Sequence, residues 1–234
     1  MLDIHCHIIH AVDDGAKTID ESIAMAKIAA KDGVRTIVAT PHIGAKIISS
    51  DDIRNKVDEL NDRLIELFIP VEILPGAEII SGIPVELIEK YTINGNGFVL
   101  IEFPHSHLPH NSFEIIRNIT SHGLKPLIAH PERNPSIIKQ PEILVDLVEK
   151  SGVGIQLTAN SITGSFGRRI RKCSQYLLKK RVVHIIASDA HSENSRKPGL
   201  SLALKEAAKI LGRKHAQKLV YDNPEAVING GTLS

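Results

Sequence analysis

The stretch Leu2-Asp3-Ile4-His5-Cys6-His7 decides the fold of this chain. Side chains alternate between the two faces of a strand, so His5 and His7 project from the same side while Leu2 and Ile4 are expected to pack from the other. Two imidazoles on one face can bind one metal ion, although two buried, hydrogen-bonded histidines would give the same pattern. The groups at the ends of the other strands distinguish these interpretations.

The composition excludes several classes of protein. A chain of 234 residues with 42% hydrophobic content can form one domain, 1–234, with a sizeable core. A net charge of +1 gives no electrostatic basis for binding nucleic acid. Two cysteines argue against a disulfide-built secreted protein, and no run of about 18 apolar residues predicts insertion into a membrane. We therefore expect a soluble, cytoplasmic protein.

Seven β-rich runs alternate with helical patterns along the whole chain. Successive runs begin about 30 residues apart, which is the length of one strand–helix unit. This alternation predicts an α/β fold with a parallel sheet and no internal domain boundary. The runs are 2–7, 34–40, 71–77, 98–103, 126–130, 153–157 and 182–188.

The helical patterns between these runs carry recognisable signals at their ends. Thr18-Ile19-Asp20-Glu21 has the spacing of a capping box, and Gly33 is expected to end the helix that follows. Apolar residues at helical spacing predict further helices over 53–67, 144–148, 170–177 and 204–211.

Metal-binding side chains recur where the runs end. In parallel βα folds the carboxyl ends of the strands carry the functional groups. Six of the seven ends present His, Asp or Glu, whereas the sixth run, near Thr158-Ala159-Asn160, offers no strong ligand. The nine candidate ligands are His5, His7, Asp14, His42, Glu78, Glu102, His130, Asp189 and His191.

The number of contributing strands favours a closed sheet. Neighbouring strands in an open sheet lie about 4.8 Å apart, so six of them would spread their ends over more than about 20 Å. Ligand bonds to ions such as Zn²⁺ are only about 2 Å long. One cluster of ligands therefore predicts a barrel of about seven strands.

The ligand set also limits the chemistry. Histidine and carboxylate without thiolate favour Mn²⁺, Fe²⁺ or Zn²⁺, and nine ligands suit two or three ions. Clustered divalent ions generate a hydroxide nucleophile and hold a phosphoryl group for in-line attack. Arg133 and Arg196 follow ligand-bearing ends, and a guanidinium matches phosphate bidentately. We expect both arginines to bind phosphate.

These motifs resemble those of the polymerase and histidinol phosphatase (PHP) superfamily. Within it, the chain resembles the manganese-dependent protein-tyrosine phosphatases of Gram-positive capsule and exopolysaccharide operons. The likeness runs from residue 1 to Asn223-Pro224-Glu225, with departures in the loops 45–51 and 104–110. It rests on Asp3-x-His5-x-His7, Val12-Asp13-Asp14-Gly15, Thr40-Pro41-His42, Gly76-Ala77-Glu78, Ile101-Glu102-Phe103, Ile128-Ala129-His130-Pro131-Glu132-Arg133 and Ser188-Asp189-Ala190-His191.

The resemblance implies a distorted (β/α)₇ TIM-like barrel of the PHP type that holds three divalent ions, with Mn²⁺ expected and Fe²⁺ or Zn²⁺ as alternatives. It implies that His5, His7, Glu78 and Asp189 hold one ion, that Glu78 bridges to a second held with Glu102 and His130, and that Asp14, His42 and His191 hold a third. Arg133, Arg196 and Asp189 would be the catalytic residues. The implied partner is the phosphotyrosine tail of a bacterial tyrosine kinase, and a homo-oligomer remains open.

Other interpretations are also consistent with parts of the sequence. Cysteine-dependent phosphatases need C-x₅-R, but the arginine position is Val12 after Cys6 and Lys179 after Cys173, so packing is the expected role of both cysteines. A small-molecule phosphatase such as histidinol phosphatase, or a metal-binding regulatory module without turnover, would use similar ligands. The histidines of 104–110 are expected at the rim of the site. The basic run 168–172 is either a solvated helix face or a contact for an acidic peptide.

Overall fold

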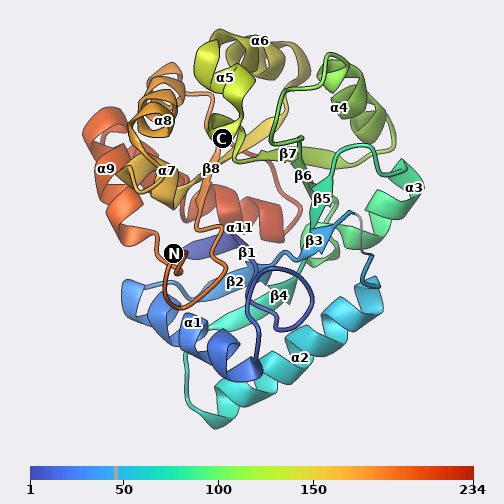
Figure 1. Ribbon diagram of the computed structural model, residues 1–234, viewed down its shortest axis with the longest axis vertical. Coiled ribbons are helices and arrows are strands. Elements are labelled where there is room, and N and C mark those ends of the chain that lie inside the picture. The colour runs from blue at the N-terminus through green and yellow to red at the C-terminus, as the bar shows by residue number, and fades with distance from the viewer. Residues whose placement is uncertain (45–46) are drawn as a thin grey trace.

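Parallel strands in the middle of the molecule, surrounded by helices, make up the fold of the computed structural model, which describes residues 1–44 and 47–234 (Figure 1). The seven expected runs all contain a strand. Two additional short strands, β3 and β5, follow the second and third runs. The strands of the described residues are β1 (Leu2–Cys6), β2 (Thr36–Ala39), β3 (His42–Ile43), β4 (Glu72–Pro75), β5 (Glu78–Ile80), β6 (Phe98–Glu102), β7 (Lys125–Ala129), β8 (Gly154–Thr158) and β9 (Ile185–Ala187).

Within residues 1–44 and 47–234 the strands form two sheets, and every pairing is parallel. One sheet has the order β1-β2-β4 and the other the order β3-β5-β6-β7-β8-β9. The chain passes from the first sheet to the second twice, through Thr40-Pro41 and through Gly76-Ala77. These passages bring the ends of β2 and β4 to the same region as the ends of β6 and β7.

The first and last strands meet at a single isolated bridge. Cys6 pairs with Ala190 in a parallel bridge, supported by Asp189 N–H donating to His5 O and His7 N–H donating to Ala190 O, each at 2.8 Å. The predicted parallel α/β architecture is confirmed. The closed barrel is not, because this bridge does not extend into a ladder and Pro41, which has no N–H, interrupts the run that contains β2 and β3.

The helices predicted from sequence all form. Thr18 Oγ1 accepts the Glu21 N–H at 3.2 Å, and Gly33 ends α1 with a φ of 90°, the left-handed conformation that glycine adopts at low cost. The helices of the described residues are α1 (Ile19–Asp32), α2 (Ser50–Glu66), α3 (Val85–Ile88), α4 (Ser112–Ser121), α5 (Pro135–Lys139), α6 (Glu142–Ser151), α7 (Ala159–Thr163), α8 (Arg168–Lys180), α9 (Ser201–Leu211), α10 (Arg213–Lys218) and α11 (Asp222–Ile228), with 3₁₀ turns η1 (Glu89–Tyr91), η2 (Ile93–Gly95) and η3 (Pro131–Arg133).

A compact inner core supports the strand ends. Ile4, Val38, Leu100 and Leu127 pack together with Val227 of α11, separately from the larger cluster that includes the residues between strands and outer helices. These strand residues precede the ligand-bearing ends in sequence. The inner core therefore fixes the positions from which the ligands project.

An irregularity in β1 changes the simple alternation predicted for this strand. Asp3 pairs with Ile37 but Cys6 pairs with Ala39, so β1 has one residue more than β2 over this interval. Asp3 Oδ1 accepts the N–H groups of Ser188 at 2.9 Å and His5 at 3.4 Å. Extra residues of this kind bend a strand and redirect side chains. As a result, two successive residues of β1 serve the inside of the fold: Ile4 packs in the inner core and His5 lies in the group of ligands.

Two further expectations concern membrane insertion and the loop 45–51. No helix among the described residues is long and apolar enough to cross a membrane. The loop 45–51, where a departure from the family pattern was expected, contains residues 45 and 46, which lie outside the described residues.

Candidate metal centre

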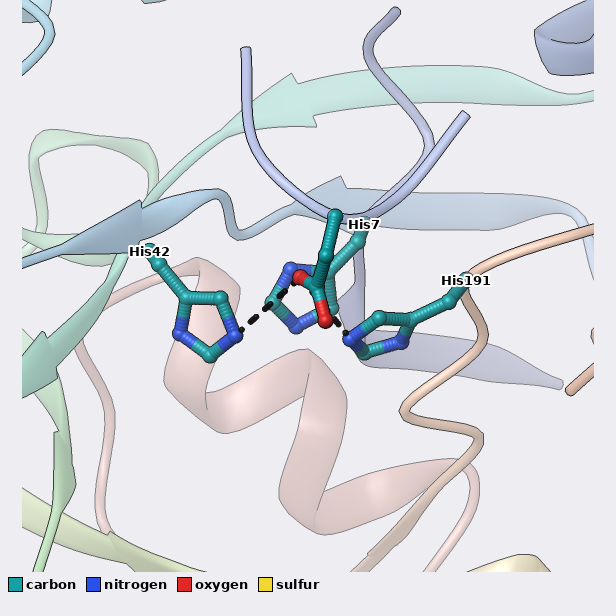
Figure 2. A group of neighbouring side chains, drawn as sticks. His7, His42 and His191 are labelled. Atoms are coloured by element: carbon teal, nitrogen blue, oxygen red, sulfur yellow. Dashed lines mark ion pairs between the residues drawn. The ribbon is translucent and has the colours of Figure 1, made fainter. Parts of the chain in front are cut away.

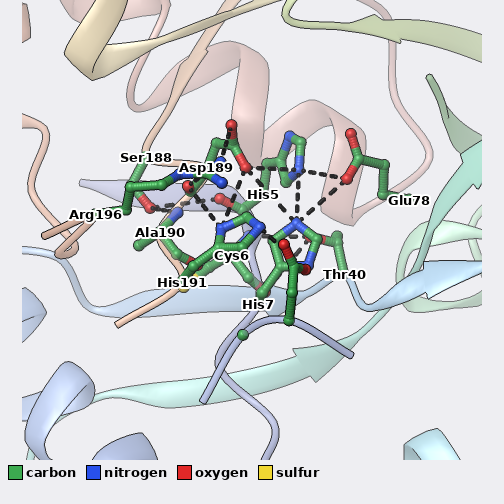
Figure 3. A network of polar contacts seen from close by, with 12 residues as sticks. His5, Cys6, His7, Thr40, Glu78, Ser188, Asp189, Ala190, His191 and Arg196 are labelled. Carbon is green, nitrogen blue, oxygen red and sulfur yellow. Dashed lines mark hydrogen bonds and ion pairs between the residues drawn. The ribbon is translucent and has the colours of Figure 1, made fainter. Parts of the chain in front are cut away.

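The strand ends bring the predicted ligands together around one buried carboxylate, Glu78 at the start of β5. Glu78 Oε2 lies 3.3 Å from His5 Nε2 and 3.2 Å from His7 Nε2. Asp189, directly after Ser188, places Oδ1 3.5 Å and 3.6 Å from the same two nitrogens. All four side chains are buried, and Figure 3 shows His5 and His7 of the β1 segment converging with Glu78 and Asp189.

The two oxygens of Glu78 also face a second set of ligands, His130 on one oxygen and His42 on the other. His130 Nε2 lies 2.7 Å from Glu78 Oε1 and 3.7 Å from Glu102 Oε1. His42 Nδ1 lies 3.1 Å from Glu78 Oε2 and 3.9 Å from Glu102 Oε2. Glu78 is thus central to the cluster, as expected for a bridging carboxylate.

A third set of ligands lies toward the surface. Asp14 Oδ1 is 3.4 Å from His42 Nε2 and 3.4 Å from His191 Nε2. The rings of His7 and His191 lie 3.8 Å apart between centroids, and Figure 2 shows His7, His42 and His191 turned toward one another. Because the Asp14 side chain is 64% exposed, this is the open end of the cluster.

All nine predicted ligands therefore lie together, but their groupings differ in detail from the expected partition. His7 joins the outer group, and His42 also joins the group of Glu78 and Glu102. The sets whose ligand atoms lie close enough to share an ion are His7–Asp14–His42–His191, His5–His7–Asp189, His5–Glu78–His130 and His42–Glu78–Glu102.

The hydrogen bonds of His5 and His7 indicate that a cation fits between them. Gln156 Oε1 lies 2.9 Å from His5 Nδ1, and Asp13 Oδ2 lies 2.7 Å from His7 Nδ1. Both partners are acceptors, so each Nδ1 donates, and in a neutral ring Nε2 then carries the lone pair. The two Nε2 atoms face each other at 3.3 Å, beside a buried Glu78 Oε2 that has no hydrogen-bond partner among the described residues.

The ionisation of the cluster without metal reflects the same crowding. Burial alone would lower the pKa of His7, but the Asp13 and Glu78 carboxylates raise the pKa to about 10. Burial, with the nearby positive charge of His7, lowers the pKa of His191 to about 3. Burial and the Glu78 charge raise the pKa of Glu102 to about 7. His7 therefore keeps a proton at neutral pH that a metal ion at this site would displace.

Both predicted phosphate-binding arginines contact Asp189. Arg133 Nη1 donates to Asp189 Oδ2 at 2.5 Å. Arg196 Nη2 forms an ion pair with the same oxygen at 2.6 Å and donates to the Asp189 backbone carbonyl at 3.1 Å. The Arg133 guanidinium also lies 5.1 Å from the centre of the Phe166 ring. His130 and Asp189 both have positive φ, 32° and 51°, which is uncommon for non-glycine residues and typical of functional sites.

Two residues that support the ligands were not predicted as site residues. Gln156 lies in β8, the strand whose end offers no ligand, yet its Oε1 accepts from His5 and from the His130 N–H at 3.3 Å. Asp13 precedes a predicted ligand and accepts from His7. The sequence could have indicated Asp13 because it stands next to the predicted ligand Asp14. It could have indicated Gln156 because this is the polar residue within the apolar run 153–157.

One histidine of the segment 104–110 and both cysteines have the positions expected for them. His105 lies at the exposed rim, with Nε2 3.1 Å from Glu102 Oε1. Cys6 and Cys173 are both unpaired and buried. Burial raises the pKa of Cys173 to about 12 and raises the pKa of Cys6 as well, so neither thiol is a reactive thiolate.

Comparisons with known proteins identify a matching family and related tyrosine-protein phosphatases. Residues 1–229 match the family described as "Capsular polysaccharide synthesis, CpsB/CapC". The tyrosine-protein phosphatase YwqE of Bacillus subtilis is 37% identical over 242 residues, which cover 100% of this chain and 93% of YwqE. The putative tyrosine-protein phosphatase CapC of Staphylococcus aureus is 36% identical, with 100% of this chain and 90% of CapC covered.

Solved structures show the same relationship. A chain from the crystal structures of YwqE from B. subtilis and CpsB from Streptococcus pneumoniae, described as unique metal-dependent tyrosine phosphatases, superposes with a TM-score of 0.94 at 36% identity and covers 100% of this chain and 96% of its own. A phosphotriesterase homology protein from Escherichia coli has a TM-score of 0.63 at 10% identity, covering 95% and 96% of the two chains. This second likeness extends to the fold alone.

Proposed function

Because the chain belongs to the CpsB/CapC family of capsular polysaccharide synthesis, we infer that it is a metal-dependent tyrosine-protein phosphatase. It is a phosphoric monoester hydrolase that does not depend on a cysteine nucleophile. The observation that carries this function is the convergence of His5 and His7 on the carboxylates of Glu78 and Asp189, with two imidazole nitrogens facing each other at 3.3 Å.

We propose that three Mn²⁺ ions bind here, with Fe²⁺ and Zn²⁺ as alternatives. Bound divalent ions supply a nucleophile from water at neutral pH and offset the charge of a phosphoryl group. The donor set of imidazole and carboxylate suits these metals. The proposed ligands are His5, His7, Asp14, His42, Glu78, Glu102, His130, Asp189 and His191.

The chain itself supplies the groups that bind and orient phosphate. Arg133 and Arg196 are partly exposed, and both hold their guanidinium groups against Asp189. Arg196 Nε is a buried donor that has no hydrogen-bond partner among the described residues. We propose that the two arginines bind the phosphoryl oxygens, while Asp189 fixes their orientation.

We propose phosphotyrosine as the substrate, on a tyrosine kinase of a capsule or exopolysaccharide system. The names of the relatives support this assignment. A phenolate leaves readily, since the pKa of tyrosine is about 10, so catalysis needs less help from an acid than with an alkyl phosphate. We further propose that residues 1–234 act as one domain, and that the two sheets with the Cys6–Ala190 bridge form a distorted seven-stranded barrel.

Phosphate release from two substrates tests this proposal. The protein is stripped with chelator and assayed with a phosphotyrosine peptide and with histidinol phosphate, with and without added Mn²⁺. We expect Mn²⁺-dependent release from the peptide alone. Preference for histidinol phosphate would overturn the substrate, and no turnover by a protein with bound metal would overturn the enzymatic function.

A further inference from the structure

An open groove lies between α5 and α8. Its volume is about 740 Å³, and the two helices pack next to each other (Figure 1). The groove is outside the ligand cluster, and no step of the proposed reaction uses it. It is lined by Pro135, Ile138, Lys139, Pro141, Glu142, Arg169, Lys172, Cys173 and Tyr176.

Both walls of the groove begin next to the phosphate-binding Arg133. Helix α5 starts at Pro135, two residues after Arg133, and α8 starts at Arg168, two residues after Phe166. Phe166 in turn lies 5.1 Å from the Arg133 guanidinium. A chain that leaves the phosphate site along the outside of this Arg133–Phe166 contact therefore meets the groove next.

The lining of the groove is basic and apolar. On α8, Arg169, Lys172 and Tyr176 follow one another at intervals of three and four residues, so they lie on one face of the helix. Lys139 faces them from α5. The described part of the chain offers these three cations no ion-pair partner, and Glu142 is the acidic residue of the lining. Because the whole chain carries a net charge of only +1, this excess of positive charge is local.

We propose that this groove binds an acidic peptide segment next to the phosphotyrosine, an assignment that rests on the proposed phosphatase function. Lys139 is the last residue of α5, four residues after Pro135 and therefore about 6 Å along the helix, which an extended peptide covers in about two residues. Acidic side chains about two to five positions from the phosphotyrosine thus reach Lys139, Arg169 and Lys172. An apolar side chain of the same segment packs on Ile138 and Tyr176.

The test compares two phosphotyrosine peptides, one with acidic flanks and one with neutral flanks, and a small aryl phosphate without a peptide. The Mn²⁺-loaded double variant Arg169→Ala/Lys172→Ala is measured beside the wild type. The matched control, Lys179→Ala/Lys214→Ala, removes two exposed positive charges outside the groove. We expect the groove variant to raise KM for the acidic peptide roughly fivefold, with kcat unchanged and the neutral peptide unaffected.

Fluorescence anisotropy with unphosphorylated versions of the same peptides measures docking without turnover. We expect the acidic peptide to bind more tightly than the neutral one, and added salt to reduce the difference. Equal effects of both double variants, or equal effects on both peptides, would overturn the groove assignment while leaving the phosphatase function intact. Loss of binding to anionic vesicles without any change in peptide kinetics would also overturn it and would indicate a membrane surface instead. Absence of turnover with every substrate would reject the phosphatase function itself.

Discussion

Arg133 donates a hydrogen bond to Asp189 Oδ2 at 2.5 Å, across 56 residues of sequence. Arg196 Nη2 forms an ion pair with the same oxygen at 2.6 Å. A carboxylate that holds two guanidinium groups keeps them close together despite their equal charges. This arrangement prepares both arginines for a ligand that is more negative than Asp189 alone, such as a phosphate monoester.

Replacement of Arg133 by alanine tests its contact with phosphate. We expect Arg133→Ala to lower kcat/KM for a phosphotyrosine peptide about 100-fold, since one preorganised donor to the phosphoryl group is lost. The metal content, measured by mass spectrometry of metals, should stay that of the wild type. Arg213→Ala, an exposed arginine of α10, is the control. A variant with wild-type kcat/KM would rule out a role of Arg133 at the phosphate.

Replacement of Gln156 tests whether its hydrogen bond with His5 Nδ1 supports metal binding by this histidine. Gln156→Met keeps the volume but removes the oxygen that accepts from His5 Nδ1, so the ring is no longer fixed in its orientation. We expect Mn²⁺ affinity, measured by titration calorimetry, to fall about 10-fold to 100-fold. Gln140→Met, at an exposed position, should bind Mn²⁺ as the wild type does. Unchanged affinity in the Gln156 variant would show that His5 needs no such partner.

The loop that carries Asp13 packs too closely to allow a larger residue at Gly15. A Cβ atom at this position would lie 2.2 Å from His7 O and 2.6 Å from His7 Cβ. Gly15→Ala should therefore displace Asp13 from His7 and weaken Mn²⁺ binding. We expect it to lower the free energy of unfolding by about 1–3 kcal/mol, which lowers the melting temperature. Gly199→Ala is the control, because its Cβ would have ordinary contacts of 3.7 Å. Equal melting temperatures for the two variants would contradict this view of the loop.

Glu132 links stability to pH. Its carboxylate is fully buried, and burial raises its pKa from 4.5 to about 7. The folded protein therefore holds a proton that the unfolded chain has released, so this residue makes stability fall as pH rises from about 4.5 to 7. We expect the decline to amount to up to about 3 kcal/mol.

The variant Glu132→Gln has no carboxyl group at this position, so its stability does not depend on ionisation there. Urea unfolding of metal-free protein at pH 5 and pH 8 should show a smaller loss of stability in the variant than in the wild type. Glu149→Gln, exposed on α6, should behave as the wild type. A parallel decline in the wild type and in Glu132→Gln would exclude Glu132 as its source.

The sequence predicts the strands and the gathering of ligands because both depend on short-range patterns. Val38 and Leu100 lie in short apolar runs, which are typical of buried strands. The carboxyl ends of parallel strands lie on one side of a sheet, so residues that follow the strands come together. The strands β3 and β5 have only two and three residues, which is too short for a periodic signal. The roles of Asp13 and Gln156 depend on which nitrogen of a ring faces which neighbour, and only the folded chain determines this.

The bridge between Cys6 and Ala190 has a consequence for the order in which the protein becomes active during its synthesis. These residues are 184 positions apart, and His5 and Asp189 are their immediate neighbours. His5 and His7 leave the ribosome well before Asp189, so they lack this carboxylate until the strand β9 and Asp189 have been translated. Contacts over such a separation form late because loop closure is costly. The nascent phosphatase is therefore silent until Asp189 has emerged and met His5.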